Sequence, residues 1–245
     1  MDRVLTAALE SRLVNAWPAF EVALVEGWLL RFASGYSKRA NSASPMVPGA
    51  DLDKGLIRHI VARFEARGIT PTFRLTGLEH PGVEARLEAF GLRDFDPTFC
   101  MVAPIDTAED PDSAVQIEPE PSPAWIRAAA GAYGGDKADR ELLGMIVGRI
   151  REETAFATLV LDDRPVAWGL GVTERGFTGL YDIVVAPDLR GLGLGRQVVR
   201  SLMAWGCRLG ATRAYLQVRE SNEVARALYR SLGFEDAYRY RHRVP

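Results

Sequence analysis

The residues best suited to chemistry form a glycine-rich turn in the second half of the chain. It reads Arg190-Gly-Leu-Gly-Leu-Gly-Arg196, directly after a predicted strand and directly before a predicted helix. Glycines let backbone N–H groups approach a ligand closely, and the helix N-terminus adds about half a positive charge. The turn therefore predicts a cradle for an anionic group, with two arginines as further charge. A purely structural turn also needs glycines, so the turn alone leaves both interpretations open.

Two common phosphate-binding motifs do not fit this turn. The dinucleotide fingerprint Gly-x-Gly-x-x-Gly follows the first strand of a parallel unit. Here the glycines occupy 191, 193 and 195 and follow a predicted hairpin late in the chain. A Walker loop requires a Gly-Lys-Ser/Thr tripeptide, which the sequence lacks. Both alternatives are therefore rejected.

A second motif begins 32 residues after Arg190. The segment from Asn222 to Phe234 matches the pattern Asn-x-x-Ala-x-x-Leu-Tyr-x-x-x-Gly-Phe, and the turn matches Arg/Gln-x-x-Gly-x-Gly/Ala. Together, with a helix and a strand between them, the two motifs resemble the acetyl-CoA signature of the GNAT superfamily of N-acetyltransferases. The resemblance covers about residues 115–245.

The resemblance implies a role for each matching residue. Backbone N–H groups of the turn would hold the pyrophosphate of acetyl-CoA, and the strand before the turn would pair with the pantetheine arm. Tyr229 would be the general acid for the leaving thiolate, although a tyrosine that only packs is the alternative. The implied cofactor-binding residues are Val184, Val185, Arg190, Gly191, Leu192, Gly193, Leu194, Gly195, Arg196 and Asn222.

The general base is less well determined. An amine must lose a proton before it attacks a thioester, and a carboxylate acting through water can accept that proton. Asp182, on the strand that leads to the turn, is the candidate, and Glu174 at a hairpin end is the second choice. Either carboxylate is also consistent with a solvated surface position. Tyr133, beside two glycines, is a candidate substrate contact.

The elements that position these motifs follow from hydrophobic periodicity and turn residues. In the C-terminal half, strand and helix patterns alternate, which predicts a mixed α/β fold (α+β, with a mixed sheet). The expected helices are 124–152 with a break, 195–209 and 223–232, and the expected strands are 156–161, 165–172, 180–185, 214–218 and 237–244.

The N-terminal half shows the same order of elements. It is expected to contain helices over 2–15, 52–66 and 83–90 and strands over 22–30, 72–76 and 99–103. A shift of 142 positions aligns Gly27 with Gly169, Pro45 with Pro187, Gly68 with Gly210, Thr70 with Thr212 and Gly91 with Gly233. Because glycine and proline fix turns, the alignment predicts two tandem GNAT-like units, the first of them truncated.

The same shift removes the chemistry from the first unit. Pro48, Asp51, Asp53 and Leu87 stand where the second unit has Arg190, Gly193, Gly195 and Tyr229, respectively. We therefore expect a degenerate GNAT-like domain over 1–104 and a catalytic domain over 115–245. An acidic, proline-rich linker over 105–123 can include the first strand of the second domain. The polar stretch Lys38–Ser42 either faces a substrate cleft through Arg39, Asn41 or Ser42, or is a solvated strand edge.

Composition limits the remaining possibilities. The 245 residues carry 30 basic and 32 acidic side chains, a net charge of −2, which argues against nucleic-acid or membrane partners. Two cysteines, Cys100 and Cys207, and three dispersed histidines give no metal cage, and buried inert thiols are expected. No signal peptide or long apolar run is evident, so a cytoplasmic protein is expected.

The resemblance to the GNAT superfamily implies an N-acetyltransferase that moves the acetyl group from acetyl-CoA to a primary amine. We expect direct attack in a ternary complex, because neither motif contains a cysteine that could carry the acetyl group. The amine would belong to a small molecule or a peptide, and the sequence determines neither this acceptor nor the oligomeric state. A non-catalytic acyl-CoA-binding regulatory module and an acyltransferase for a longer acyl-CoA are the alternatives.

Overall fold

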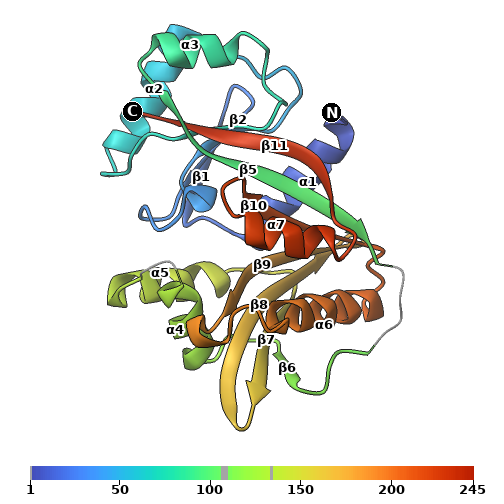
Figure 1. Ribbon diagram of the computed structural model, residues 1–245. Helices are drawn as coiled ribbons and strands as arrows, with labels where there is room; N and C mark the ends of the chain where they lie inside the picture. The colour runs from blue at the N-terminus through green and yellow to red at the C-terminus, as the bar shows by residue number, and fades with distance from the viewer. Residues whose placement is uncertain (1, 106–109, 133–134) are drawn as a thin grey trace. The chain divides into compact units, whose positions relative to one another are not determined.

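The computed structural model describes residues 2–105, 110–132 and 135–245 (Figure 1). These residues form two compact units, which are described separately. The N-terminal unit contains Met1–Cys100, Val218–Glu223 and Asp236–Pro245, and the C-terminal unit contains Met101–Gln217 and Val224–Glu235. Helices and mixed parallel and antiparallel strands occur in both units, so the predicted mixed α/β fold is confirmed.

The N-terminal unit has the strand order β1-β2-β3-β4-β11-β5. Only β3 and β4 are parallel neighbours among the pairs β1·β2, β2·β3, β3·β4 and β4·β11. Its elements are α1 (Arg3–Ala16), β1 (Glu21–Val25), β2 (Trp28–Phe32), β3 (Ala43–Pro45), α2 (Lys54–Glu65), β4 (Phe73–Leu75), α3 (Val83–Ala89), β5 (Arg93–Pro104) and β11 (Glu235–Val244). The expectation of one strand over 22–30 was wrong, because Glu26 and Gly27 form a turn and make this run a hairpin.

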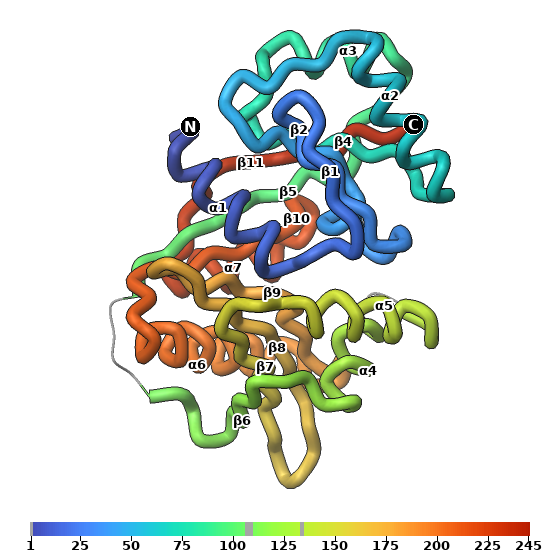
Figure 2. Tube along the Cα trace, turned by 180° about the vertical axis from the view of Figure 1, so that it is seen from behind, coloured from blue at the N-terminus to red at the C-terminus, as the bar shows by residue number. Residues whose placement is uncertain are grey.

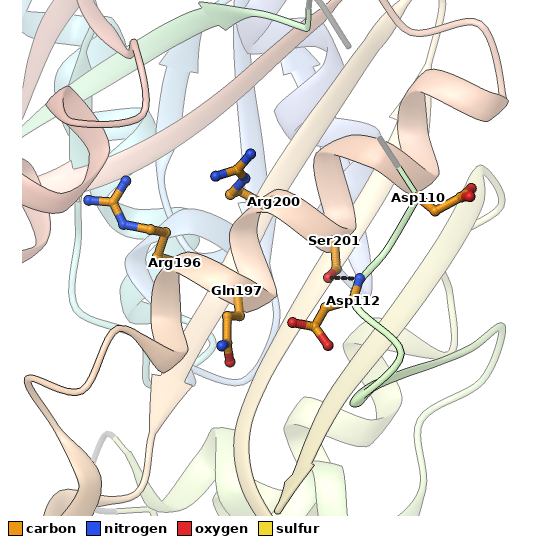
Figure 3. Close-up of a pocket in the computed structure, with 6 residues that line it drawn as sticks. All are labelled: Asp110, Asp112, Arg196, Gln197, Arg200 and Ser201. Atoms are coloured by element: carbon orange, nitrogen blue, oxygen red, sulfur yellow. Dashed lines mark hydrogen bonds between the residues drawn. The ribbon is translucent and has the colours of Figure 1, made fainter. Parts of the chain in front are cut away.

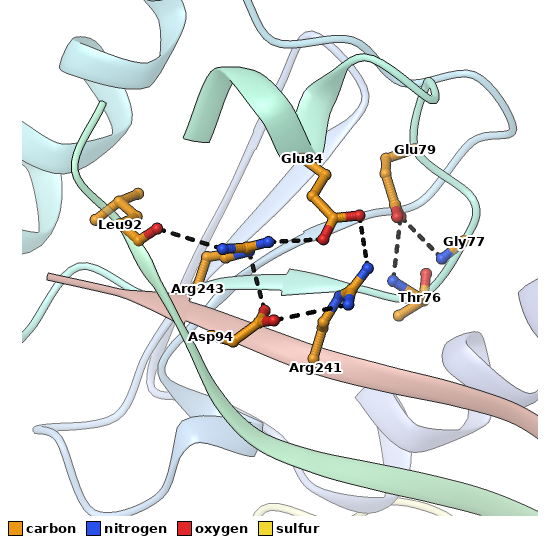
Figure 4. A network of polar contacts seen from close by, with 8 residues as sticks. All are labelled: Thr76, Gly77, Glu79, Glu84, Leu92, Asp94, Arg241 and Arg243. Carbon is orange, nitrogen blue, oxygen red and sulfur yellow. Dashed lines mark hydrogen bonds and ion pairs between the residues drawn. The ribbon is translucent and has the colours of Figure 1, made fainter. Parts of the chain in front are cut away.

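The two faces of this sheet differ because side chains alternate along each strand. One face packs against α2 and α3 through a hydrophobic core that includes Trp28, Leu30, Phe32, Ile60, Phe64, Phe73 and Leu75. On β11, Arg241 and Arg243 donate to Glu84 of α3 at 2.5 and 2.6 Å, and Arg243 also pairs with Asp94 at 3.1 Å (Figure 4). The opposite face carries buried polar groups, among them an ion pair of Arg74 with Glu10 of α1.

The C-terminal unit has the strand order β10-β9-β8-β7-β6, with β9 and β10 parallel and the other pairs antiparallel. Its elements are β6 (Val115–Glu118), α4 (Pro123–Gly131), α5 (Lys137–Val147), β7 (Glu153–Leu161), β8 (Arg164–Glu174), β9 (Phe177–Val185), α6 (Leu194–Arg208), β10 (Arg213–Arg219) and α7 (Glu223–Arg230). Helix α6 lies on one side of β7, β8 and β9, and α4 and α5 lie on the other (Figures 1 and 2). The segment 105–123 contains β6, the strand that the sequence left open.

The compact units are not continuous in sequence, whereas the predicted domains are. Residues 236–245 of β11 belong to the N-terminal unit, and Met101–Pro104 of β5 belong to the C-terminal unit. Two of the aligned glycine pairs occupy matching places, since Gly68 and Gly210 follow α2 and α6, and Gly91 and Gly233 follow α3 and α7. Gly27, in contrast, lies in a hairpin turn and Gly169 lies within β8. The tandem organisation stays a prediction.

Candidate functional site

The glycine-rich turn leads into the N-terminus of α6 as predicted. Gly191 and Gly193 have φ angles of +82° and +81°, and Gly193 is the N-cap residue of the helix. A side chain rarely adopts this backbone conformation, so both positions favour glycine. A Cβ atom at either residue would meet nothing within 4 Å, which leaves open space beside the backbone.

The backbone donors of this turn are available to a ligand. Among the described residues, no acceptor receives the N–H groups of the range 191–195, whereas the Arg196 and Gln197 N–H groups both donate to the Gly193 carbonyl, at 3.0 and 3.2 Å. Free N–H groups at a helix N-terminus bind anions well, because the helix dipole adds to the hydrogen bonds. The turn therefore fits a pyrophosphate.

Strand β9 ends beside this turn with one edge only partly paired. Its parallel pairing with β10 covers only Phe177 to Leu180, although β9 continues to Val185. On the other edge, Val184 and Val185 pair with Trp168 and Ala167 of β8. The last residues of β9 thus offer a strand edge to which an extended ligand can add, as in β-augmentation.

Asp182 lies in a β-bulge of β9. Between the pairs Leu170–Tyr181 and Trp168–Val184, β9 has one residue more than β8, and Asp182 has a φ angle of +48°. The side chain is buried, with 6% exposure, so the alternative of a solvated surface carboxylate is wrong for this residue. Glu174, the second choice, lies at the end of β8 and pairs with Arg175 at 2.7 Å.

Tyr229 lies on α7 and is buried against Phe234, with ring centroids 5.9 Å apart. Burial raises the pKa of Tyr229 to about 12, so the phenol keeps its proton at neutral pH. Its hydroxyl makes no hydrogen bond to any other side chain or backbone group that the structure describes. The phenol is thus a protonated donor that an external acceptor can use.

Contacts hold α7 and β9 against the turn. A Cβ atom on Gly195 would lie 3.5 Å from Leu228 Cδ2 of α7 and 3.6 Å from Val185 Cγ2 of β9. Arg196 also donates to Ser231 Oγ, just after α7, at 2.7 Å. The structure therefore brings the predicted turn, the end of β9 and the helix that carries Tyr229 into one place.

Sequence reasoning missed an ion pair that holds the segment before the turn. Arg164, at the start of β8, donates to both carboxylate oxygens of Asp188 at 2.9 and 3.1 Å. The Arg164 guanidinium lowers the pKa of the Asp188 carboxyl. Arg190 Nε lies 3.4 Å from the Val185 carbonyl, at the far side of the same segment. No regular spacing links these residues, so no sequence pattern would have found the pair.

A pocket of about 300 Å³ lies along the outer side of α6, next to the turn (Figure 3). It is lined by Arg196, Gln197, Arg200, Ser201, Asp110 and Asp112. The Asp112 N–H donates to Ser201 Oγ at 3.0 Å, which closes one side. The pocket is lined by both arginine and aspartate side chains. Its arginine nearest the turn is Arg196, in the first turn of α6.

The remaining predicted residues belong to the N-terminal unit or fall outside the described residues. Asn222 belongs to the N-terminal unit, where its N–H donates to the Arg219 carbonyl at 3.0 Å, so its role toward the turn stays a prediction. Tyr133 lies outside the described residues. Asn41 and Ser42 are buried, so the alternative of a solvated strand edge was wrong for them. Asn41 Oδ1 accepts from the backbone of residues 33 and 35 at 2.7 and 3.0 Å, and Arg39 stacks on Trp17 at 4.2 Å.

The described residues contain no group of three or more His, Cys, Asp or Glu side chains arranged to hold a metal ion. Cys100 is buried, which raises its thiol pKa to about 12, and Cys207 is half-buried. In the part of the chain that the structure covers, no helix combines the length and the apolar character needed to cross a membrane.

Comparisons with known proteins identify the family of the chain. The family model described as the C-terminal part of the probable histone acetyltransferase Rv0428c matches residues 6–243. The uncharacterized N-acetyltransferase YobR of Bacillus subtilis is 28% identical over 242 residues, which cover 96% of this chain and 97% of YobR. The probable histone acetyltransferase Rv0428c of Mycobacterium tuberculosis is 29% identical over 232 residues, 93% of this chain and 70% of that protein.

A solved structure shows the same fold. The GCN5-related N-acetyltransferase from Kribbella flavida superposes with a TM-score of 0.70 at 18% identity, over 99% of this chain and 94% of that chain. The family model and the relatives named as acetyltransferases, together with this fold, show that the chain is a GNAT-family acetyltransferase. Within the GNAT superfamily, the chain belongs to the family of the Rv0428c C-terminal region.

Proposed function

We propose that this protein transfers the acetyl group of acetyl-CoA to a primary amine by direct attack in a ternary complex. The observation that carries the proposal is the row of free N–H groups at 191–195 beside the partly paired end of β9. Acetyl-CoA would supply the acetyl group as an activated thioester. The chain's own residues bind that cosubstrate, orient the amine and handle the protons.

Binding would use the turn and the strand edge. The turn N–H groups and the α6 dipole would hold the pyrophosphate, with Arg190 and Arg196 beside it. The backbone of Val184 and Val185 would hydrogen-bond the pantetheine arm as a neighbouring strand does.

Proton handling would fall to Asp182 and Tyr229. Asp182, buried at the bulge, would attract the ammonium form of the acceptor and take its proton. Tyr229, with a pKa of about 12, is a weaker acid than a thiol with a pKa of about 8–9. A complete proton transfer to the departing thiolate is therefore uphill, and Tyr229 would act mainly by donating a hydrogen bond to it. Such a donor contributes a modest factor in rate.

The N-terminal unit is proposed as a GNAT-like unit without a cofactor site. Helix α2, which the repeat aligns with α6, has Asp53 as its N-cap, and the Asp53 carboxylate accepts the Leu56 N–H at 2.7 Å. Asp51 adds a second carboxylate and is ion-paired with Arg86. An anion at this helix terminus would find a donor already used and would be repelled by two carboxylates.

The test is thiol release from acetyl-CoA across a panel of amines. The relative Rv0428c is named a probable histone acetyltransferase, so the panel should contain lysine-bearing histone peptides. It should also contain peptides with free N-termini and small polyamines as other classes of amine. Turnover on one class, reduced in Tyr229→Phe, would support the proposal. Binding of acetyl-CoA without turnover on every amine would instead favour a non-catalytic module, and faster turnover with butyryl-CoA would indicate a longer acyl donor.

A further inference from the structure

The bulge in β9 has a partner residue on β8. Because Trp168 pairs with Val184 and Leu170 pairs with Tyr181, Gly169 alone faces the two residues Asp182 and Ile183. A bulge of this kind disrupts the hydrogen-bond ladder and turns the strand. The residues that follow it are Val184 and Val185, which offer the strand edge described above.

A tryptophan from α4 is hydrogen-bonded to this point of the sheet. Trp125 Nε1 donates to the Gly169 carbonyl at 3.1 Å, and the Trp125 side chain is fully buried. Its ring meets Phe156 of β7 edge-on, with centroids 5.0 Å apart and an interplanar angle of 88°. The Trp125 backbone N–H donates to Ser122 Oγ, the N-cap of α4, at 3.1 Å. Both ends of the residue are therefore fixed.

Gly169 also contacts the other elements of the site. A Cβ atom on Gly169 would lie 2.7 Å from Ile183 Cδ1 in the bulge and 2.8 Å from Val198 Cγ1 of α6. Both distances are shorter than real Cβ contacts, so β8 must approach β9 and α6 here without a side chain. A shift of β8 at Gly169 would thus be transmitted to the bulge and to the helix that begins at the turn.

We propose that Trp125 is a positioning residue whose indole N–H, bonded to the Gly169 carbonyl, fixes the bulge that orients Asp182, Val184 and Val185 for acetyl-CoA binding and acetyl transfer. The proposal rests on the proposed function of this site. In this proposal Trp125 acts through β8, by way of its bond to the Gly169 carbonyl.

The experiment uses the full chain and two buried tryptophans with the same type of hydrogen bond. Trp125→Phe removes the indole donor at the bulge. Trp28→Phe is the matched control, because Trp28 Nε1 donates to the Asp51 carbonyl at 3.0 Å and its side chain is also fully buried, against Phe73. Calorimetry gives the Kd for acetyl-CoA, thermal unfolding gives Tm, and kinetics gives KM and kcat.

Both variants should lower Tm by similar amounts. Trp125→Phe should raise the acetyl-CoA Kd and KM about tenfold, whereas Trp28→Phe should change Kd less than twofold. Phe156→Leu, which loosens the indole but keeps its N–H, should raise Kd about threefold and provides the test if Trp125→Phe does not fold. An unchanged Kd in every folded variant, or equal changes in both tryptophan variants, overturns the proposal.

The binding measurement separates this inference from the proposed function. If no amine is acetylated by the wild type, the proposed function fails, yet the acetyl-CoA Kd values still decide whether Trp125 positions the strand edge.

Discussion

Lowering the pH from 7 to 5 should destabilise the protein through one buried side chain, His242 on β11. The ring is 3% exposed, and among the described residues its Nδ1 and Nε2 atoms find no hydrogen-bond partner. Burial, followed by the positive charges of Arg74, Lys38 and Arg219, lowers the pKa of His242 from 6.5 to about 3. A proton on this ring would have to be accommodated without solvent and beside three cations.

The sign and size of the effect follow from proton linkage. The unfolded chain binds a proton at His242 below pH 6.5, while the folded chain does not bind it until about pH 3. The stability contribution is therefore fully present above pH 6.5 and is lost as the pH falls toward 3, at about 1.4 kcal/mol per pH unit. At pH 5 the loss amounts to about 2 kcal/mol.

Urea unfolding at pH 7 and pH 5, for the wild type and for His242→Gln, measures this loss. The variant can be less stable at pH 7, but its free energy of unfolding should fall about 2 kcal/mol less between the two pH values than that of the wild type. Each protein gives one change in the free energy of unfolding between pH 7 and pH 5. Subtracting the change of the variant from that of the wild type removes the contributions of all titrating groups that the two proteins share. Parallel pH dependences in the two proteins would refute the assignment of the effect to His242.

Three further predictions concern the site itself. Tyr229→Phe should lower kcat about tenfold to a hundredfold with little change in KM, and because the Tyr229 pKa is about 12, the wild-type rate should show no basic limb from this residue below pH 10. Gly193→Ala forces a side chain into φ +81° and should raise the acetyl-CoA Kd about tenfold, whereas Gly210→Ala, at φ +84° after the far end of α6, should lower Tm similarly without changing Kd. Asp182→Asn should lower kcat at least about a hundredfold while acetyl-CoA still binds, and Glu174→Gln is its control. Equal losses in both carboxylate variants would exclude a special role for Asp182.

The elements next to the chemistry could be predicted from the sequence because local rules determine them. The glycines at 191 and 193 were expected in a turn before a helix, and they have the positive φ angles that only glycine adopts readily. Turn residues hidden in apolar runs were missed, as in the hairpin β1–β2, where hydrophobic residues on both sides of Glu26 and Gly27 suggest one strand.

Features that depend on the register between distant strands could not be predicted. The bulge at Asp182 exists because β9 has one residue more than β8 between two fixed pairs, and neither strand alone shows this. The bond from Trp125 to Gly169 joins residues 44 positions apart through tertiary packing. The buried position of Asn41 likewise results from loops folding around its amide, although its polar neighbours suggested solvent.

The place of β11 has a consequence for how the chain acquires its structure during synthesis. The N-terminal unit includes residues 236–245, which the ribosome adds well after residues 1–100, and Arg241, His242 and Arg243 pair with Leu75, Arg74 and Phe73 of β4. Until those residues emerge, β4 has an open edge of the kind that recruits foreign strands. Strand β4 must therefore wait for β11, which is made much later, so a premature stop before β11 would leave the earlier strand β4, rather than the truncated segment, prone to aggregation.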